Sequence, residues 1–242
     1  MTVLSLEMVT IPEGFFLMGA DEEKEIDSEY EEQPEKQVWL STYQIQQTPV
    51  TVGHWHEFLR QTDYSWNLHH EVAQNSPTFE HPITHISWYD ACKFTEWLRE
   101  TLGSNYALPT EAQWEKACRG QHGQLYPWGD QEPEWADEIP LYVESNLPIG
   151  SRPDWQSPYG CLDMWQGVRE WCLDWFDYGD YFHDASVEWL DPDGIETGEL
   201  KVIRGGSPLT SGWPRCTYRC GVDPNSRHNT LGFRIVLNPS VS

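Results

Sequence analysis

Six cysteines are the side chains of this 242-residue sequence with most potential for chemistry, because a thiolate is both a nucleophile and a ligand for soft metals. No two of them have Cys-x-x-Cys spacing, so neither a zinc ribbon nor a thioredoxin-like site is indicated. Cys216 and Cys220 are four residues apart in a strand-like segment and would face one side of a sheet. A metal site there would need two further ligands, which the sequence does not identify. The six are Cys92, Cys118, Cys161, Cys172, Cys216 and Cys220.

Other catalytic patterns are weak. The sequence has no Gly-x-Ser-x-Gly nucleophile elbow, no phosphate-binding Walker loop and no Rossmann glycine pattern. Nine histidines and many acids allow Ser-His-Asp triads on paper only. The sequence leaves open a pair of catalytic carboxylates of the glycosidase type, because the distance between two carboxylates is set by the fold.

The charge balance is strongly acidic. A formal net charge of −24 repels phosphate backbones, so we expect no nucleic-acid partner. Residues 21–32 form an acidic run that could bind cations or a basic partner. We favour the alternative interpretation, in which residues 21–36 form a solvated, mobile loop. No apolar run approaches the ~18 residues of a membrane helix, so we expect no membrane partner. The first residues lack a secretory signal, which predicts a cytoplasmic protein with reduced thiols.

The elements that must position any site are short. Thr51, Ser87 and Thr110 have the spacing of helix N-caps, and each precedes apolar residues at helical intervals. Helices in the first half and strands in the second predict an α+β domain over 1–242, with a core dense in the 14 tryptophans. Strands are predicted at 8–19, 38–45, 168–175, 201–204, 216–222 and 232–237.

Two glycine motifs frame a turn-rich segment near the C-terminus, Arg-Gly-Gly-Ser at 204–207 and Leu-Gly-Phe-Arg at 231–234. With six further motifs in order, they resemble the formylglycine-generating enzyme (sulfatase-modifying factor) family, which includes ergothioneine-synthase and pyoverdine-maturation types. The resemblance spans about 8–237 and implies a C-type-lectin-like α+β fold, with two to three helices around twisted antiparallel sheet and much irregular loop. The further motifs occupy 11–19, 48–51, 81–91, 109–115, 126–129 and 159–164.

The resemblance also implies where copper chemistry would lie. Active members bind one copper(I) ion with two cysteines after the Gly-Gly-Ser motif, and those positions here are Thr210 and Arg215. A hydroxyl is a hard ligand and a guanidinium is a permanent cation, so neither suits copper(I). Cys216 is one residue from the second position, but Thr210 would still leave a single sulfur. We therefore identify a divergent member without the copper-binding cysteine pair, and we expect no copper.

The ergothioneine-synthase branch holds iron in a separate helical domain with a His-x3-His-x-Glu motif, and this sequence lacks that domain. His81 and His85 match the first two ligands by spacing, but Ser87 replaces the carboxylate and Pro82 disfavours a helix. We interpret both histidines as structural.

Two other family features are altered. Where relatives hold calcium at a Gly-Asn-Val-Trp-Glu-Trp turn, this sequence has Gly167 for the asparagine, and Glu170 remains a weak calcium candidate. Alternatively, Arg169 replaces the ion by pairing with Glu170 or Asp174. The resemblance also implies that Cys118 and Cys220 lie close together, as a disulfide or as a buried thiol pair. No other cofactor is expected.

In some bacterial and phage relatives the segment before Gly-Phe-Arg is a ligand-binding face, which in a subset is diversified by a retroelement. Aromatic, arginine and small polar residues of this kind are typical of protein-binding surfaces, although an ordinary polar loop with Trp213 in the core is an equal alternative. The face here would comprise Pro208, Leu209, Thr210, Ser211, Trp213, Arg215, Thr217, Tyr218, Asp223, Asn225, Arg227, His228 and Asn229.

The leading hypothesis is therefore a non-catalytic module that binds a protein or a small molecule through this face. The rival hypothesis is a metal-dependent oxidoreductase or a protein-maturation factor of the formylglycine-generating, ergothioneine-synthase or pyoverdine type. A third is a non-catalytic partner of an active paralogue. Metal content and oxygen uptake separate the first two.

Overall fold

The computed structural model describes residues 5–131, 146–165, 167–184, 189–206 and 215–239. All pairs of neighbouring strands in the described sheets are antiparallel, except that β9 runs parallel to β6. One four-stranded sheet has the order β1-β4-β10-β5, formed by Met8–Ile11, Tyr43–Gln46, Val236–Leu237 and Tyr106–Ala107. The other has the order β8-β7-β6-β9, formed by Arg219–Val222, Lys201–Arg204, Arg169–Trp175 and Leu231–Gly232. A two-stranded sheet pairs β2 (Gly14–Met18) with β3 (Lys36–Leu40).

The three predicted helix starts are confirmed. Thr51, Ser87 and Thr110 each accept a hydrogen bond from the third helical N–H and form a capping box, which satisfies donors that a helix leaves unpaired. The helices are α1 (Val52–Gln61), α2 (His69–Asn75), α3 (Trp88–Leu102), α4 (Glu111–Arg119) and α5 (Asp180–His183), with 3-10 turns at Tyr30–Glu32 and Pro153–Trp155. The sequence analysis did not predict α2 and α5.

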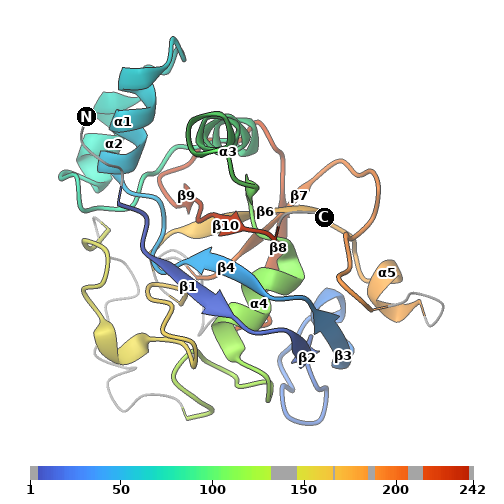
Figure 1. Ribbon diagram of the computed structural model, residues 1–242. Helices are drawn as coiled ribbons and strands as arrows, with labels where there is room; N and C mark the ends of the chain where they lie inside the picture. Colours follow the sequence, from blue (N-terminus) through green and yellow to red (C-terminus); the bar gives the residue numbers. More distant parts are fainter. Residues whose placement is uncertain (1–4, 132–145, 166, 185–188, 207–214, 240–242) are drawn as a thin grey trace.

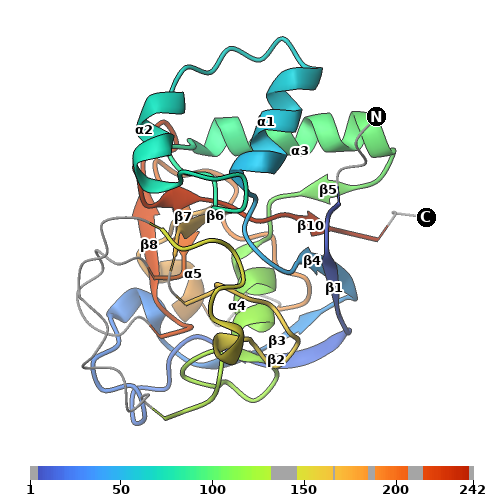
Figure 2. The same cartoon turned by 90° about the vertical axis from the view of Figure 1, so that its left-hand side faces the viewer.

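The helices divide between the ends and the centre of the molecule. Figure 1 shows α1, α2 and α3 gathered at one end, with β2 and β3 at the other. α4 lies in the centre, where it contacts β2, β3, β6 and β7 (Figure 2). Two large apolar clusters follow from this arrangement, one around α4 and one between α1, α3 and the sheets. α4 is therefore the element on which a site between the sheets is built.

Three sequence predictions need correction. The predicted strand over 38–45 is two strands in different sheets, because β3 pairs with β2 whereas β4 pairs with β1 and β10. The apolar piece 232–237 is not one strand, because Gly232 belongs to β9 in one sheet and Val236 to β10 in the other. The acidic run is not wholly solvated, because Glu25 and Glu32 are buried. Strand pairing decides where the strands divide, and buried arginines decide that Glu25 and Glu32 are covered. Neither cause can be read from a local sequence pattern.

Among the described residues, no helix is both long and apolar enough to cross a membrane. The longest, α3, has 15 residues and exposes charged side chains along one side.

Candidate functional site

Arg204, at the end of β7, binds the backbone of residues 216–218, within the predicted binding face. Its guanidinium is fully buried and donates to the carbonyl oxygens of Thr217 at 2.7 Å and Cys216 at 3.0 Å. It also pairs with the carboxylate of Glu115 on α4. Arginine suits this role because its planar fork can serve several acceptors at once. Residues 216–218 are thus anchored to both a strand and a helix.

Arg204 belongs to a buried network of alternating charges that crosses the middle of the molecule. Arg119 pairs with Glu115 at 3.0 Å and with Glu25 at 3.4 Å, so the network reaches the acidic loop. At the other end, Glu111 lies 3.4 Å from Arg204. Each charge has an opposite partner, which is the condition for burying ions at tolerable cost.

Arg219 on β8 closes that end of the network. Its guanidinium donates to both carboxylate oxygens of Glu111, at 2.6 and 2.8 Å, and it also donates to the carbonyl oxygens of Glu31 and Asp177. A two-pronged pair of this kind fixes orientation as well as distance. β8 is thereby tied to α4 and to the acidic loop together.

The electrostatics of the network favour the charged forms of Arg204 and Glu111. Burial alone would lower the pKa of Arg204, but the carboxylates of Glu115 and Glu111 raise it above its ordinary value. Burial would raise the pKa of Glu111, but Arg219 and Arg204 hold it below its ordinary value. Burial raises the pKa of Glu25, against the effect of Arg119. We call these buried ion pairs the framework; they join Glu25, Glu111, Glu115, Arg119, Arg204 and Arg219.

Arg215, at the family's second copper position, pairs with this framework. Its guanidinium forms ion pairs with Glu25 at 3.0 Å and with Glu32 at 3.7 Å. Thr217 is buried, and its hydroxyl donates to Glu25 at 2.9 Å. Both residues were predicted to contact ligand, but the structure commits Thr217 to the interior and most of Arg215 to the acidic loop.

Cys118 has a different partner from the one expected. Its sulfur lies 3.0 Å from that of Cys216, and both thiols are buried. Cys220 packs instead against the cluster between α1 and α3, so the pairing of Cys118 with Cys220 is wrong. The reason is that successive side chains of a strand point to opposite faces: Arg219 points towards Glu111 on α4, so Cys220 points away from this helix. Burial raises the pKa of the Cys118 thiol well above its ordinary value.

Copper(I) does not fit the described donors of this region. Arg215 is a cation at one ligand position, and Cys118 and Cys216 are protected from solvent. Metal–thiolate bonds are about 2.3 Å for zinc, so a linear two-sulfur site holds its sulfurs more than about 4 Å apart. The separation of 3.0 Å is shorter than that.

Calcium does not fit Glu170 either. Its carboxylate accepts from Arg234 at 2.6 and 2.9 Å and from the indole N–H of Trp114 at 2.8 Å, fully buried. A guanidinium against both oxygens repels a divalent cation. Arg169 does not replace the ion in the expected way, because its guanidinium donates to the Thr230 hydroxyl at 3.2 Å and, among the described residues, forms no ion pair with Glu170 or Asp174.

Asp174 is a buried acid beside the network. One oxygen accepts from the backbone N–H of Glu111 at 2.6 Å. Burial and then the Glu111 carboxylate raise the pKa of Asp174 to about 7. A cavity of about 20 Å³ beside it is large enough for one water molecule and no larger ligand.

The rest of the predicted face, 223–229, lies against the start of α3. Arg227 donates to both carboxylate oxygens of Asp90 at 2.7 and 2.9 Å, and the hydroxyl of Tyr64 donates to the same group at 2.5 Å. The backbone N–H of His85 donates to the carbonyl of His228. The backbone at His85 therefore supports the segment 223–229.

The predicted face is therefore split by β8 into two parts. Arg215 and Tyr218 precede this strand and are half-buried, whereas the residues after it are more open. The four residues of β8, Arg219–Val222, separate the two parts by about 13 Å. The exposed residues of the second part are Asp223, Asn225, Arg227, His228 and Asn229. Pro208, Leu209, Thr210, Ser211 and Trp213 lie outside the described residues.

Sequence reasoning missed the acids of the framework. Glu111 and Glu115 look like the polar face of an amphipathic helix, yet both are buried, as are Lys116 and Arg119 on the same helix. The available signal was the set of arginines in predicted apolar strands, Arg204, Arg219 and Arg234, because a buried guanidinium requires a buried acid.

Comparison with known proteins decides the family. Residues 3–239 match the sulfatase-modifying factor enzyme 1-like domain (FGE-sulfatase). The chain belongs to that family. A formylglycine-generating enzyme of Thermomonospora curvata is 27% identical over 292 residues, covering 96% of this chain and 93% of the relative. The serine/threonine-protein kinase pkn1 of Chlamydia caviae is 29% identical over 254 residues, and the match spans 96% of this chain but 38% of the kinase.

Solved structures confirm the fold of this sulfatase-modifying factor-like chain. PvdO from Pseudomonas aeruginosa superposes with a TM-score of 0.77 at 22% identity, covering 96% of this chain and 94% of PvdO. Treponema denticola variable protein 1 gives a TM-score of 0.74 at 21% identity, with 96% and 95% covered. The α+β fold class predicted from the sequence is confirmed by this family and these neighbours.

Proposed function

We propose that this sulfatase-modifying factor-like domain binds a protein or small-molecule ligand without chemistry of its own, through its C-terminal face. The observation that carries the proposal is Arg215. At a position where the family's enzymes have a metal-binding cysteine, a guanidinium pairs with Glu25 and Glu32. A cation locked in ion pairs supplies neither a nucleophile nor a soft ligand.

The framework supports recognition because its buried hydrogen bonds and ion pairs hold the segment that leads to the exposed residues. Arg204 and Arg219 tie the segment 216–222 to α4, so the residues that follow start from a fixed point. Binding residues are commonly loop residues held by a scaffold of this kind. The exposed His228 and Asn229 lie beside Arg227, which Asp90 holds in place. Side chains that are already ordered lose less entropy on binding.

A finer form of the proposal is that the face varies between gene copies, as the name of Treponema denticola variable protein 1 suggests for that protein. The framework residues would then stay constant while positions such as Asn225, His228 and Asn229 change. Sequencing this gene from many isolates tests this form. Changes spread evenly over framework and face would contradict it.

A second candidate function is oxidative chemistry, favoured by the relatives named formylglycine-generating enzyme. Its test is metal analysis of protein purified without chelator, combined with oxygen uptake in the presence of dithiothreitol and a cysteine-containing peptide. We expect oxygen uptake equal to that of the buffer. Stoichiometric copper, with uptake that is lost in Cys216→Ser, would replace the binding proposal by the enzymatic one.

The binding proposal is tested by photo-cross-linking. A benzophenone side chain replaces Asn229 on the face or, as a matched control, the exposed Glu100 on α3. In extracts of the source organism, we expect a discrete cross-linked product from position 229 that is absent from position 100. Excess unlabelled protein should remove it, and excess Arg227→Ala protein should compete less well. Identical products from both positions, or none from 229, would contradict the proposal.

A further inference from the structure

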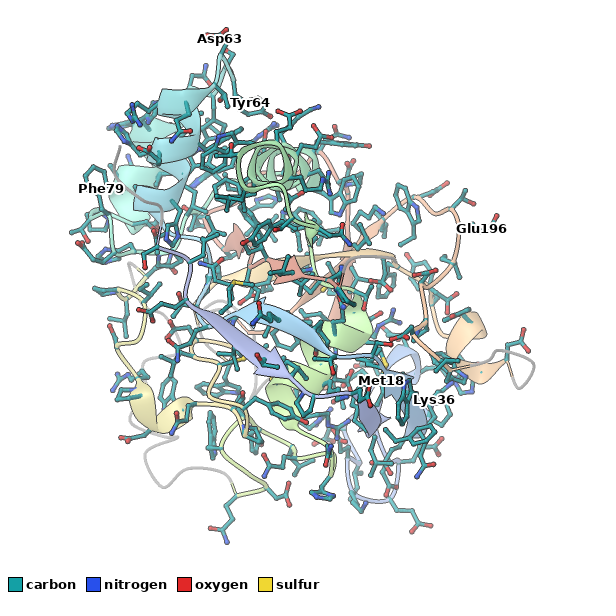
Figure 3. The ribbon with its side chains drawn as sticks, viewed as in Figure 1. Met18, Lys36, Asp63, Tyr64, Phe79 and Glu196 are labelled. Carbon is teal, nitrogen blue, oxygen red and sulfur yellow. The ribbon has the colours of Figure 1, made fainter. Side chains whose placement is uncertain are left out.

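The contact between Cys118 and Cys216 has no part in the ligand binding proposed above. Both are free thiols, both side chains are buried, and their sulfur atoms lie 3.0 Å apart. A disulfide bond has an S–S distance of about 2.05 Å, so the two sulfurs must approach by about 1 Å to form one. They belong to the apolar cluster around α4, and Figure 3 shows Met18, another member of this cluster, on β2 beside this helix.

Both cysteines are held by ordered backbone. Cys118 lies in the last turn of α4, which the ion pairs of the framework hold in place. The backbone N–H of Cys216 donates to the carbonyl of Leu125 at 2.8 Å, and its own carbonyl accepts from Arg204 at 3.0 Å. Reactive groups held beside each other in this way react as if at high local concentration. The fold therefore favours a bond between these two sulfurs.

The fold also selects this pair over the pairings that the sequence allows. Cys220 packs against the cluster between α1 and α3, whereas Cys118 and Cys216 are members of the cluster around α4. Cys220 is thus separated from both of them although it is only four residues from Cys216. A bond from Cys220 to either partner would require β8 to turn over, and the two-pronged pair of Arg219 with Glu111 opposes that.

Burial determines when such a bond can form. It raises the pKa of the Cys118 thiol well above its ordinary value, and Arg204 and Arg234 oppose this only in part. A thiolate is the species that attacks a disulfide, so the buried pair resists oxidants that approach from solvent. The bond must therefore form while the chain folds, before the segment 216–218 has packed against α4.

We propose that Cys118 and Cys216 form a disulfide bond when the protein folds in an oxidising medium, which cross-links α4 to the segment 216–218. The oxidant is a small disulfide such as oxidised glutathione. In the first step the thiolate of one cysteine attacks a glutathione sulfur, and one glutathione thiolate leaves. In the second step the other cysteine attacks the protein sulfur of the mixed disulfide, and the second glutathione leaves. The protein loses two protons and two electrons, and one oxidised glutathione becomes two reduced ones.

The bond joins positions 98 residues apart. A cross-link over so long a loop restricts the unfolded chain more than the folded one, so the oxidised protein should be the more stable form. It would also anchor the segment that leads into β8 by a covalent bond, in addition to the hydrogen bonds from Arg204. The proposal does not depend on what the C-terminal face binds.

The first experiment maps the bond in the full-length chain. Reduced, unfolded protein is refolded in a mixture of oxidised and reduced glutathione, free thiols are blocked with iodoacetamide, and tryptic peptides are analysed by mass spectrometry without reduction. Trypsin separates the relevant cysteines, because it releases the peptides 117–119, 216–219 and 220–227. We expect 117–119 linked to 216–219 as the main product, whereas oxidation in concentrated urea should give a mixture. A main link from 117–119 to 220–227, the same mixture in both conditions, or six blocked thiols would overturn the proposal.

The second experiment measures thermal unfolding of oxidised protein and of the same protein reduced with dithiothreitol. We expect the midpoint of the oxidised wild type to be about 5–10 °C higher. Cys216→Ala should remove this difference. Cys161→Ala is the matched control, because Cys161 is buried in the same cluster, and should retain it. Equal midpoints for the two wild-type forms, or a difference that persists in Cys216→Ala, would contradict a bond that fits the native fold; the peptide map of the wild type decides the pairing even where a variant fails to fold.

Discussion

The sulfur of Cys118 on α4 lies 3.0 Å from the sulfur of Cys216, 98 residues later in the chain. This contact joins the central helix to the segment 216–218, at the point where Arg204 also binds the backbone. The pair is buried, and burial raises the pKa of Cys118 well above its ordinary value. Thiols in this state pack as small apolar groups and do not act as nucleophiles.

The first prediction concerns thiol reactivity in the folded protein. Cys92 and Cys220 are half-buried, whereas the other four cysteines are buried. With N-ethylmaleimide at pH 7.5, we expect Cys220 to be alkylated well before Cys118 and Cys216, as measured by peptide mass spectrometry over time. Unfolding in guanidinium should make all rates similar. Equal rates in the native protein would mean that the pair is open to solvent.

The second prediction concerns Glu115, which pairs with Arg119 and Arg204. Glu115→Gln leaves two buried guanidinium groups short of a charge partner. We expect a loss of about 3–5 kcal/mol in the free energy of unfolding, measured by urea denaturation. Glu96→Gln is the control, because Glu96 pairs with Lys93 at the surface and such pairs contribute about 0.2–1 kcal/mol. Similar losses in both variants would contradict a buried network.

The third prediction concerns pH. Burial raises the pKa of Asp174 to about 7 from an ordinary value of 3.8, so the folded state keeps this proton where the unfolded chain has lost it. Its contribution to stability is fully present below pH 3.8 and is lost as the pH rises through about 7. The wild type should therefore lose stability relative to Asp174→Asn between about pH 4 and 7, with a slope of up to about 1.4 kcal/mol per pH unit.

Asparagine at 174 can still accept from the N–H of Glu111, so the comparison isolates the titration. The exposed Asp193→Asn serves as a control and should follow the wild type at every pH. A pH-independent difference between the wild type and Asp174→Asn, measured by urea denaturation, would show that Asp174 titrates at its ordinary pH.

The fourth prediction concerns Gly19, where β2 leads into the acidic loop. Its φ is +86°, and an added Cβ would lie 2.6 Å from the carbonyl oxygen of Pro34. Gly103 also has a positive φ, +68°, but an added Cβ there meets open space. Gly103→Ala should cost about 1–2 kcal/mol from backbone strain alone. Gly19→Ala should cost clearly more, because backbone atoms must also move, and equal losses in urea denaturation would contradict the close contact.

Local features were predictable where the chemistry is local. The N-caps at Thr51, Ser87 and Thr110 depend on residues three positions apart, so the sequence alone located α1, α3 and α4. The family motifs likewise identified the α+β fold. α2 was missed because Leu68 at its N-cap makes no side-chain capping bond, and the helix depends on tertiary packing.

The candidate site was predictable only in part. The sequence indicated that Arg215 replaces a ligand cysteine, but not that Glu25, 190 positions earlier, neutralises it. It also placed Thr217 on the binding face, whereas the structure buries this residue against the same glutamate. Exposure of a side chain depends on which distant segment covers it.

The sequence by itself determined the family, the main helix starts and the departure from a two-cysteine metal site, because these depend on residue types and short spacings. The tertiary structure decided that Cys118 faces Cys216 and that the acidic loop supplies buried carboxylates. The physical reason is that charge pairing and burial are settled between segments about a hundred or more residues apart, where no local pattern fixes the partner.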